Sequence, residues 1–400
     1  MGRPLRAETF SASEVGIVHV CQRCVRRAFL TGDDPVTGKS FEFRREWIRR
    51  RLEILSAVFG LDVLTYAILS NHLHVVLRTR PDVVETWSDE EAARRWLRLF
   101  PGKRLEEHLG EPTKADIERL VNDAKTLTRI RLRLSDVSWF MRALAEPIAR
   151  LANRQDQVTG RFWEGRFRAQ KIVDESGLLA CAMYVDLNPI RAALAATPEE
   201  SQYTSAYDRI EALKGSEQVS AAGELPPVTA YEESLEREIV QAEKQGDAQR
   251  LSASRAKLAQ AQKKKAERAK RAKRIARDGW LSPLELNERG PLGPQASRSG
   301  IRASDKGFLS LNLQDYLKLL DWTGRQGRSD KRGKIPAALA SILERIGIDS
   351  SMWCDLVWSY KRYFGRSRAA GRPENMQQDA AQHGHRWVHG QRSAAACFCT

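Results

Sequence analysis

The chain has 400 residues, of which 42% are hydrophobic, and it carries 66 Lys and Arg against 51 Asp and Glu. A globular core is therefore expected, and the formal charge of +15 favours a polyanionic partner, nucleic acid first and an anionic membrane second. No apolar run reaches the roughly 20 residues of a membrane span, and the N-terminus lacks the apolar segment of a secretory signal. We therefore expect a cytoplasmic protein without a membrane partner.

The chain contains six cysteines. Cys21-x-x-Cys24 has the spacing of half a zinc site, but no second pair lies at a finger-like distance from it. Cys397-x-Cys399 stands in the last four residues, where chain ends are often loosely held. Reduced thiols are the expected state.

The first part of the chain mixes strand and helix patterns. Ile17 to Cys21 reads as a short strand, and Glu42 to Phe59 reads as a helix with one apolar stripe. Two further strands, Asp62 to Leu69 and His72 to Arg78, are joined at Ser70-Asn71 as a hairpin.

The next part is mostly helical. Residues 88 to 133 predict a charged helical insertion over the sheet, and Ser135 to Asn153 predicts an amphipathic helix bent at Pro147. Gly160 to Val173 predicts an aromatic hairpin leading into a strand, and Asp174 to Asn188 a helix stopped by the following proline. The order β-α-β-β-α-β plus a final helix predicts an α+β protein with an antiparallel, ferredoxin-like (split βαβ) sheet. That arrangement hosts many functions, so it does not decide this one.

Composition changes beyond about residue 216, which predicts three segments. Residues 1–215 form the α+β domain, 216–279 a charged helical linker, and 280–400 a small α-helical region with a loose tail. Between Arg255 and Arg277 there are eleven Lys or Arg and one acid, a net charge of +10. This one-sided charge favours contact with the phosphate backbone of a nucleic acid over a merely solvated helix. The residues expected to make this contact include Lys263, Lys264, Lys265 and Arg268.

The stretch "YAILSNHLHVVLR" carries two histidines separated by one residue. Because strand side chains alternate, His72 and His74 share the more polar face, whereas Leu73, Val75 and Leu77 form the core face. The histidine Cα atoms would be ~7 Å apart, close enough for both imidazoles to bind one ion. The alternative is a pair of satisfied surface histidines.

The stretch "LLACAMYVDLNPIRAAL" offers a tyrosine for the same site. Tyr184 and Asn188 are four residues apart on one helical face, and Gly177, Ala180 and Cys181 would leave room in front of the phenol. A phenol with a pKa near ~10 becomes a usable nucleophile once a cation lowers that value or stabilises the transition state. A divalent metal on two imidazoles and one amide or carboxylate oxygen would keep positions open for a phosphate oxygen. The alternative is a half-buried structural tyrosine.

Other candidates fit the same chemistry less directly. Asp186 points roughly away from Tyr184 and is interpreted as a surface or backup group. His383, His385 and His389 have ligand-like spacing but stand in a tail without an apolar strand, so no site is expected there. The chain contains no G-x-x-x-x-G-K-[ST] loop, and we expect no nucleotide cofactor.

Basic and aromatic residues alternate just before the Tyr184 helix. Such interleaving suits a single nucleic-acid strand, because the cations neutralise the backbone and the rings stack on bases. Some of these rings must instead be core. The basic residues are Arg161, Arg166, Arg168 and Lys171, with weaker support for Arg23, Arg26 and Arg27, and the rings are Phe162, Trp163 and Phe167.

These motifs carry a family resemblance over roughly residues 15 to 210. His72-Leu73-His74 resembles the motif of the HUH endonucleases. "GRFWEGRFRAQKIVDESGLLACAMYVDLNPIRAAL" resembles the second signature of single-tyrosine transposases of the IS200/IS605-like group, in the branch associated with repetitive extragenic palindromes (REP).

The resemblance implies an enzyme that cuts and rejoins single-stranded DNA at hairpin or palindromic sites with Mg²⁺ or Mn²⁺ as cofactor. Tyr184 would be the nucleophile, and His72 and His74 the metal ligands. Asn188 stands where the insertion-sequence enzymes have a glutamine as third ligand. Relatives act as exchanged dimers or, in the palindrome-associated branch, as monomers. The alternatives are a catalytically silent hairpin-binding protein, a plasmid relaxation or replication nuclease, and an RNA-binding sheet.

Overall fold

The structure is a computed structural model, and its two units are considered separately. The first comprises Met1–Tyr207 with Trp280–Thr400, and the second comprises Asp208–Gly279. Arg26, Arg27 and Cys399 lie outside the described residues. No described helix is long and apolar enough to cross a membrane. The described residues are 9–25, 30–34, 38–101, 112–222, 228–275, 277–286, 293–326, 336–365 and 367–398, without the side chains of 217–234 and 264–276.

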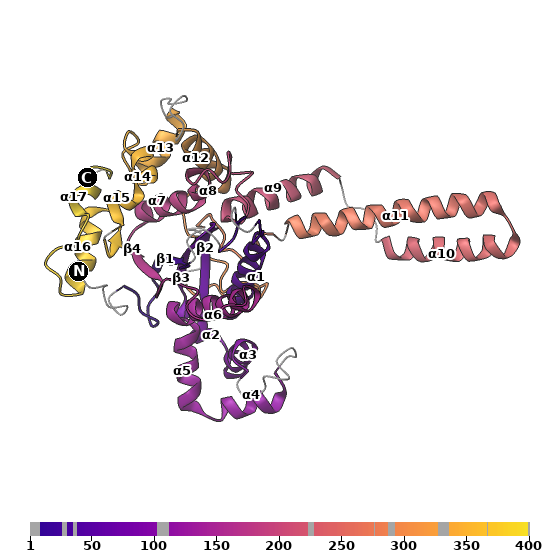
Figure 1. Ribbon diagram of the computed structural model, residues 1–400, viewed down its shortest axis with the longest axis horizontal. Coiled ribbons are helices and arrows are strands. Elements are labelled where there is room, and N and C mark those ends of the chain that lie inside the picture. Colours follow the sequence, from indigo (N-terminus) through magenta and orange to yellow (C-terminus); the bar gives the residue numbers. More distant parts are fainter. Residues whose placement is uncertain are drawn as a thin grey trace. The chain divides into compact units, whose positions relative to one another are not determined.

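The first unit is built around a sheet whose described strands follow the order β2-β3-β1-β4-β5 (Figure 1). Neighbouring strands are antiparallel except β4 and β5, which are parallel. The hairpin predicted at Ser70-Asn71 is confirmed, because it joins β2 directly to β3. This mostly antiparallel sheet with its many helices agrees with the predicted α+β class. The strands are β1 (Ile17–Arg23), β2 (Leu61–Ile68), β3 (His72–Thr79), β4 (Arg168–Ile172) and β5 (Ala369–Ala370).

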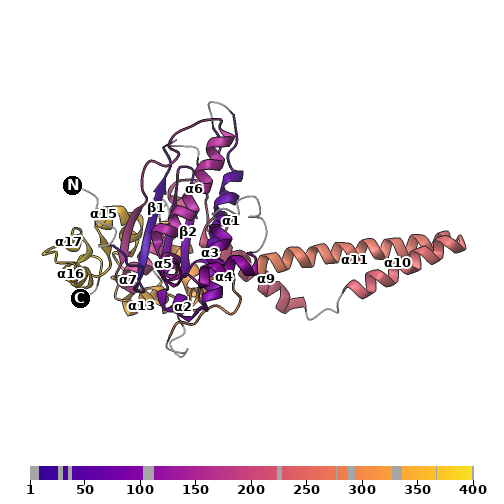
Figure 2. The same cartoon turned by 90° about the horizontal axis from the view of Figure 1, so that it is seen from below.

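Helices cover both faces of the sheet (Figures 1 and 2). Leu73, Val75 and Leu77 pack in one core with the apolar stripes of α1 and α6, which confirms the predicted core face. The opposite face, which carries His74, is buried as well, because α7 and C-terminal helices pack against it. The more polar face of β3 is therefore a buried face, which its sequence pattern did not indicate. These helices are α1 (Phe43–Val58), α6 (Val137–Gln155) and α7 (Glu175–Asp186).

The predicted insertion is helical where the structure describes it. Its helices contribute apolar residues, such as Leu97, Ile117 and Leu127, to the same hydrophobic core that α1 and α6 form with the sheet. Side chains of Ser88 and Thr113 cap two of their N-termini. The helices are α2 (Pro81–Thr86), α3 (Asp89–Leu99), α4 (Lys114–Val121) and α5 (Ala124–Leu134).

Helix α7 crosses the histidine face of the sheet. It begins after Asp174, whose carboxylate accepts a hydrogen bond from the Gly177 N–H at 2.8 Å. Gly177 also permits close packing, since a Cβ there would lie 2.6 Å from the Ala370 carbonyl oxygen of β5. The helix was predicted to run to Asn188 and to be stopped by Pro189, but α7 ends at Asp186. Pro189 lies in the first turn of a separate short helix, α8 (Asn188–Arg191), where proline is tolerated.

The C-terminal region shares its core with α7. Leu309, Tyr316, Trp353 and Phe364 join the α7 residues in one hydrophobic cluster. Near the chain end, Phe398 is also buried. The helices of this region are α12 (Leu313–Gln326), α13 (Ala337–Arg345), α14 (Trp353–Trp358), α15 (Tyr360–Phe364), α16 (Pro373–Gln382) and α17 (Gln391–Ala394).

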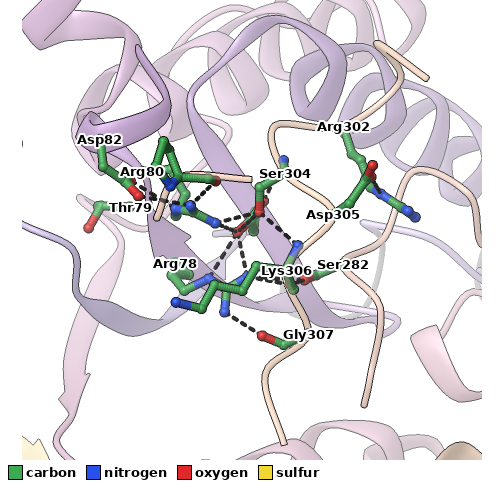
Figure 3. Close-up of polar contacts among 12 residues, drawn as sticks. Arg78, Thr79, Arg80, Asp82, Ser282, Arg302, Ser304, Asp305, Lys306 and Gly307 are labelled. Atoms are coloured by element: carbon green, nitrogen blue, oxygen red, sulfur yellow. Dashed lines mark hydrogen bonds and ion pairs between the residues drawn. The ribbon is translucent and has the colours of Figure 1, made fainter. Parts of the chain in front are cut away.

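A buried ionic cluster ties the segment before α12 to the sheet (Figure 3). Asp62 on β2 accepts hydrogen bonds from Arg78 at 2.7 and 2.9 Å and from the Ser304 hydroxyl at 2.8 Å. Arg78 also donates to the Gly307 carbonyl at 2.7 Å, and Arg80 donates to the Ser304 hydroxyl at 2.5 Å. Arg78 therefore holds the C-terminal region in place.

The second unit contains a helical hairpin, in which α10 (Val228–Gln245) and α11 (Ala248–Ile275) lie side by side (Figure 2). The Ser254 hydroxyl bonds the Glu238 carboxylate at 3.2 Å, and Arg255 pairs with Glu243 at 2.8 Å. Gly246 makes the turn with a φ of +67°. Helix α9 (Ser205–Ala222) leads into this unit.

Candidate active site

A cavity of about 440 Å³ lies on the histidine face of the sheet. Its wall comes from β1, β3 and β4, from α7, and from the C-terminal helix α15. His72, His74 and Tyr184 all line it, so the structure brings together three of the four predicted metal-site and catalytic residues.

The register of the sheet explains why these side chains converge. Cys21 on β1 is opposite His74 on β3 and Arg168 on β4, and His19 is opposite Gln170. Directly opposed residues in an antiparallel pair point to the same face. Three strands therefore present polar side chains to one cavity.

The rings of His72 and His74 each use Nδ1 in a hydrogen bond and leave Nε2 without one among the described residues. The ring centroids of His72 and His74 are 4.9 Å apart. His72 Nδ1 bonds the Asn71 amide oxygen at 2.5 Å, and His74 Nδ1 bonds His19 Nε2 at 2.9 Å. Within the described residues, Nε2 of His72 and Nε2 of His74 are buried without a hydrogen-bond partner.

Both rings are uncharged at neutral pH. Burial, helped by the positive charges of Lys361 and Arg23, lowers the pKa of His72 to about 4. Burial also holds the pKa of His74 well below 6.5, with further lowering by its two neighbouring histidines. The neutral imidazole is the form that binds a metal.

Tyr184 stands over this pair from α7. Its ring is 5.5 Å from that of His74, centroid to centroid, and its hydroxyl has no hydrogen-bond partner in the described part of the chain. The guanidinium of Arg191 lies 4.9 Å from the centre of the same ring. Burial raises the pKa of Tyr184 to about 12, and the Arg191 charge acts in the opposite direction.

The space expected in front of Tyr184 is filled. Tyr360 of α15 stacks on its ring at 4.8 Å, and the same Tyr360 lies against Cys181. Gly177 faces β5 instead. The small residues of α7 therefore admit the C-terminal region, which corrects the expectation of an open approach to the phenol.

Asn188 is the least favourably placed of the predicted ligands. It is buried in α8, and its side chain lowers the pKa of the Tyr184 phenol as a hydrogen-bonding group beside it, but it does not line the cavity. Its Nδ2 atom has no hydrogen-bond partner among the described residues. Asp186 was interpreted as a surface group, and this was wrong: it is fully buried and accepts hydrogen bonds from Ser205 and from Tyr316.

The basic residues predicted to bind DNA separate into two groups. Arg166 and Arg168 line the cavity, joined by Arg23. Arg161 is exposed elsewhere, and Lys171 pairs with Asp379 at 2.6 Å away from the cavity. Lys263 is exposed on α11, while the side chains of Lys264, Lys265 and Arg268 lie outside the described set.

The aromatic residues of that stretch are core. Phe162 and Phe167 are buried, and Trp163 packs against the same cluster while its indole N–H donates to the Ala145 carbonyl at 2.8 Å. None of these rings lines the cavity beside Arg166 and Arg168. They hold the arginine loop in place.

Sequence reasoning missed His19, Tyr360 and Lys361, which line the cavity, and Arg191, which lies over the Tyr184 ring. His19 stands on alternate positions with Cys21 in a short strand, which was its only signal. Arg191 follows Tyr184 by seven residues, a spacing that returns to the same helical face. Tyr360 and Lys361 lie far away in the chain and have no local signal.

The donor set fits a divalent metal held by two imidazoles. In the described ranges, no group of three His, Cys, Asp or Glu side chains is arranged to hold an ion. The predicted site needs only two such side chains, and their unpartnered Nε2 atoms face one basic cavity. Imidazole suits Zn, Cu, Fe and Ni, whereas oxygen ligands suit both Mg²⁺ and Mn²⁺, so the two imidazoles alone do not distinguish between the two expected cations.

Comparisons with known proteins add little. No protein-family model matches the sequence, and no curated protein matches it. Among solved structures, a REP-associated tyrosine transposase bound to a REP hairpin is similar at 11% identity and a TM-score of 0.30, over 51% of this chain and 82% of that chain. At those values the likeness carries no argument for this site, whose interpretation rests on its own geometry.

Proposed function

We propose that this protein is a metal-dependent enzyme that cleaves and rejoins single-stranded DNA at hairpin or palindromic sites. The observation that carries the proposal is one basic cavity that holds a tyrosine beside two neutral histidines, with the reactive atoms of all three left unpartnered within the described residues. The sequence resemblance to REP-associated single-tyrosine transposases supports it. So does the strand order β2-β3-β1-β4, with α1 between β1 and β2, which is that of a ferredoxin-like sheet.

In the proposed reaction Tyr184 is the nucleophile and Arg191 stabilises its charge. Tyr184 Oη attacks the scissile phosphorus and loses its proton, while the bond to the 3′ oxygen breaks and that oxygen takes up a proton. The products are a 5′-phosphotyrosine and a free 3′ hydroxyl, so the bond energy is kept for rejoining. Arg191 stabilises the phenolate as it forms, since its charge already lowers the pKa of Tyr184.

The site would bind its cofactor and substrate through separate groups. His72 Nε2 and His74 Nε2 would hold the cation, with Asn188 as the proposed third ligand. When bound there, a divalent cation supplies Lewis-acid polarisation of a phosphate oxygen. Arg23, Arg166 and Arg168 would neutralise the DNA backbone.

One observation favours a second candidate, a hairpin-binding protein that does not cleave. Tyr184 is fully buried and the pKa of its phenol is raised to about 12, so deprotonation is costly in the DNA-free state. The two functions differ in whether a covalent product forms.

The test is a labelled single-stranded hairpin, taken from palindromic DNA that flanks the gene, incubated with the protein and Mn²⁺. An adduct that resists denaturation and maps to Tyr184 by mass spectrometry is expected. Tyr184→Phe should abolish adduct and nick while hairpin binding persists, because charge supplies the affinity. Tyr363→Phe is the matched control, because Tyr363 lies on α15 but does not line the cavity. Tight binding with neither nick nor adduct would favour the non-cleaving protein.

A further inference from the structure

His19 occupies a buried position directly behind the proposed metal ligand His74. The two rings stack with their centroids 5.0 Å apart, and His19 Nε2 is 2.9 Å from His74 Nδ1. One of these two nitrogens must donate a proton and the other must accept it. Which one donates decides whether His74 Nε2 can bind a metal.

The neighbour of His19 on β4 settles the direction of that hydrogen bond. The Gln170 amide nitrogen donates to two backbone carbonyls, that of Phe364 at 2.6 Å and that of Ser367 at 3.0 Å. Both of its N–H groups are therefore engaged, and these two acceptors fix the orientation of the amide. The Gln170 oxygen can only accept, and it does so from the Tyr360 hydroxyl at 3.2 Å.

Gln170 also lies directly opposite His19 in the β1–β4 register, and its side chain raises the pKa of His19, as a hydrogen-bond acceptor does. Because the Gln170 oxygen can only accept, the proton in that contact belongs to His19 Nδ1. A neutral ring with its proton on Nδ1 presents a lone pair at Nε2. The bond to His74 must then run from His74 Nδ1–H to His19 Nε2, which leaves His74 Nε2 without a proton.

We propose that His19, oriented by Gln170, is the positioning residue of the metal site: it fixes His74 as the tautomer whose Nε2 lone pair faces the cavity. This inference rests on the proposed function, because it assumes that a cation binds at His74 Nε2. Such outer hydrogen bonds orient metal-binding histidines, and their loss costs about 10- to 100-fold in metal affinity. Gln170 extends the chain of contacts to Phe364 and Ser367 of the C-terminal region.

The first measurement uses the unaltered protein without metal. Its histidine side chains are labelled with ¹⁵N, and the shifts of the ring nitrogens report which one carries the proton. His74 is expected to be protonated at Nδ1 and unprotonated at Nε2. A proton on His74 Nε2 would overturn the proposal, and no variant has to fold for this result.

The second measurement is the Mn²⁺ affinity of variants by calorimetry. His19→Phe keeps a ring but has no acceptor, so binding should weaken by about 10- to 100-fold. His19→Gln supplies an acceptor oxygen and should retain most of the affinity. His389→Phe is the control for loss of an exposed histidine elsewhere. Unchanged affinity in His19→Phe would contradict the proposal, as would loss in both His19 variants, which would indicate a direct ligand.

These measurements are independent of DNA cleavage. If the tautomer and the Mn²⁺ affinities follow the expectation but no DNA adduct forms, the positioning role stands and the proposed nuclease function fails. If adducts form while His74 carries its proton on Nε2, the reverse holds.

Discussion

Tyr360 stacks on Tyr184 with ring centroids 4.8 Å apart and an angle of 19° between the planes. The second ring belongs to the C-terminal region, whereas the first is on α7 beside the histidine pair. The Tyr360 hydroxyl donates to Gln170 at 3.2 Å, so Tyr360 contacts both Tyr184 on α7 and Gln170 on β4. The C-terminal region is thus a wall of the candidate active site.

Removal of that stacked ring should destabilise the first unit. Tyr360 is 2% exposed, and truncation of a large buried aromatic residue to alanine costs about 3–5 kcal/mol of unfolding free energy. Tyr360→Phe keeps the ring and loses one hydrogen bond, so it should cost about 1 kcal/mol. Urea denaturation of both variants measures the difference. Equal losses would show that the hydroxyl, and not the stacked ring, supplies the stability.

Acid should destabilise the metal-free protein through its buried histidines. Burial, and then the charge of Lys361, lowers the pKa of His19 from 6.5 to about 4, although a hydrogen bond with Gln170 raises it. At pH values between about 4 and 6.5, His19 binds a proton in the unfolded chain but not in the folded chain. The free energy of unfolding should therefore fall as the pH drops from about 6.5 to about 4, by about 3 kcal/mol for this group alone.

Urea denaturation at a series of pH values, with EDTA present, measures this fall. His72 has its pKa lowered to about 4 as well and adds in the same direction. His19→Gln removes one titrating group, so its profile should be shallower than that of the unaltered protein. Parallel profiles for the two proteins would contradict the lowered pKa of His19.

The strand alternation of β3 could be read from sequence because its period is two and its apolar face is continuous. Leu73, Val75 and Leu77 define that face, and the histidines follow on the other. The burial of the histidine face could not be read, since Tyr360 comes from a distant segment whose pairing with α7 leaves no local pattern. Long-range contacts of this kind depend on the tertiary fold and not on periodicity.

The same reason explains two other errors. Asp186 does point away from the cavity, but that direction leads to Ser205 and Tyr316 and not to solvent. His19 was visible as a strand residue, but its contact with His74 depends on the β1–β3 register, which the sequence does not specify. Tyr184 and His72 were found because each stands in a short motif with its own spacing.

The ionic cluster around Asp62 should be sensitive to a change of one atom. Asp62 is 1% exposed and pairs with both Arg78 and Arg80. Asp62→Asn leaves two buried guanidinium groups without their shared anion, and breaking a buried pair costs about 3–5 kcal/mol. Thermal or urea unfolding measures the loss. Asp321→Asn, which breaks an exposed pair with Arg325, is the control and should cost under about 1 kcal/mol.

Metal binding should depend on both histidines of β3. Replacing His72 or His74 with alanine removes one of the two unpartnered Nε2 atoms, so Mn²⁺ affinity measured by calorimetry should fall steeply in either variant. EDTA should abolish adduct formation by the unaltered protein. Cleavage that persists both with EDTA and in the double variant would exclude a metal at this site.

Lys361 offers the most direct test of whether the C-terminal region contacts DNA. It lines the cavity with Arg23 and Arg168, and no described residue forms an ion pair with it. Arg362 is its neighbour on α15, is exposed, and does not line the cavity. Both residues are basic and stand on the same helix, but only Lys361 lines the cavity, so variants of the two form a matched pair.

Lys361→Met should weaken the binding of single-stranded hairpins and make it less dependent on salt. Each phosphate contact contributes about 0.7 to the slope of the logarithm of the binding constant against the logarithm of the salt concentration, so the loss of one contact should lower the slope by that amount. The loss should be the same for palindromic and scrambled hairpins, since a phosphate contact reads no sequence. Arg362→Met should leave the slope nearly unchanged. Fluorescence anisotropy at several salt concentrations measures both. Equal slopes for the two variants would mean that α15 contributes general charge near the DNA and that Lys361 does not reach the backbone within the cavity.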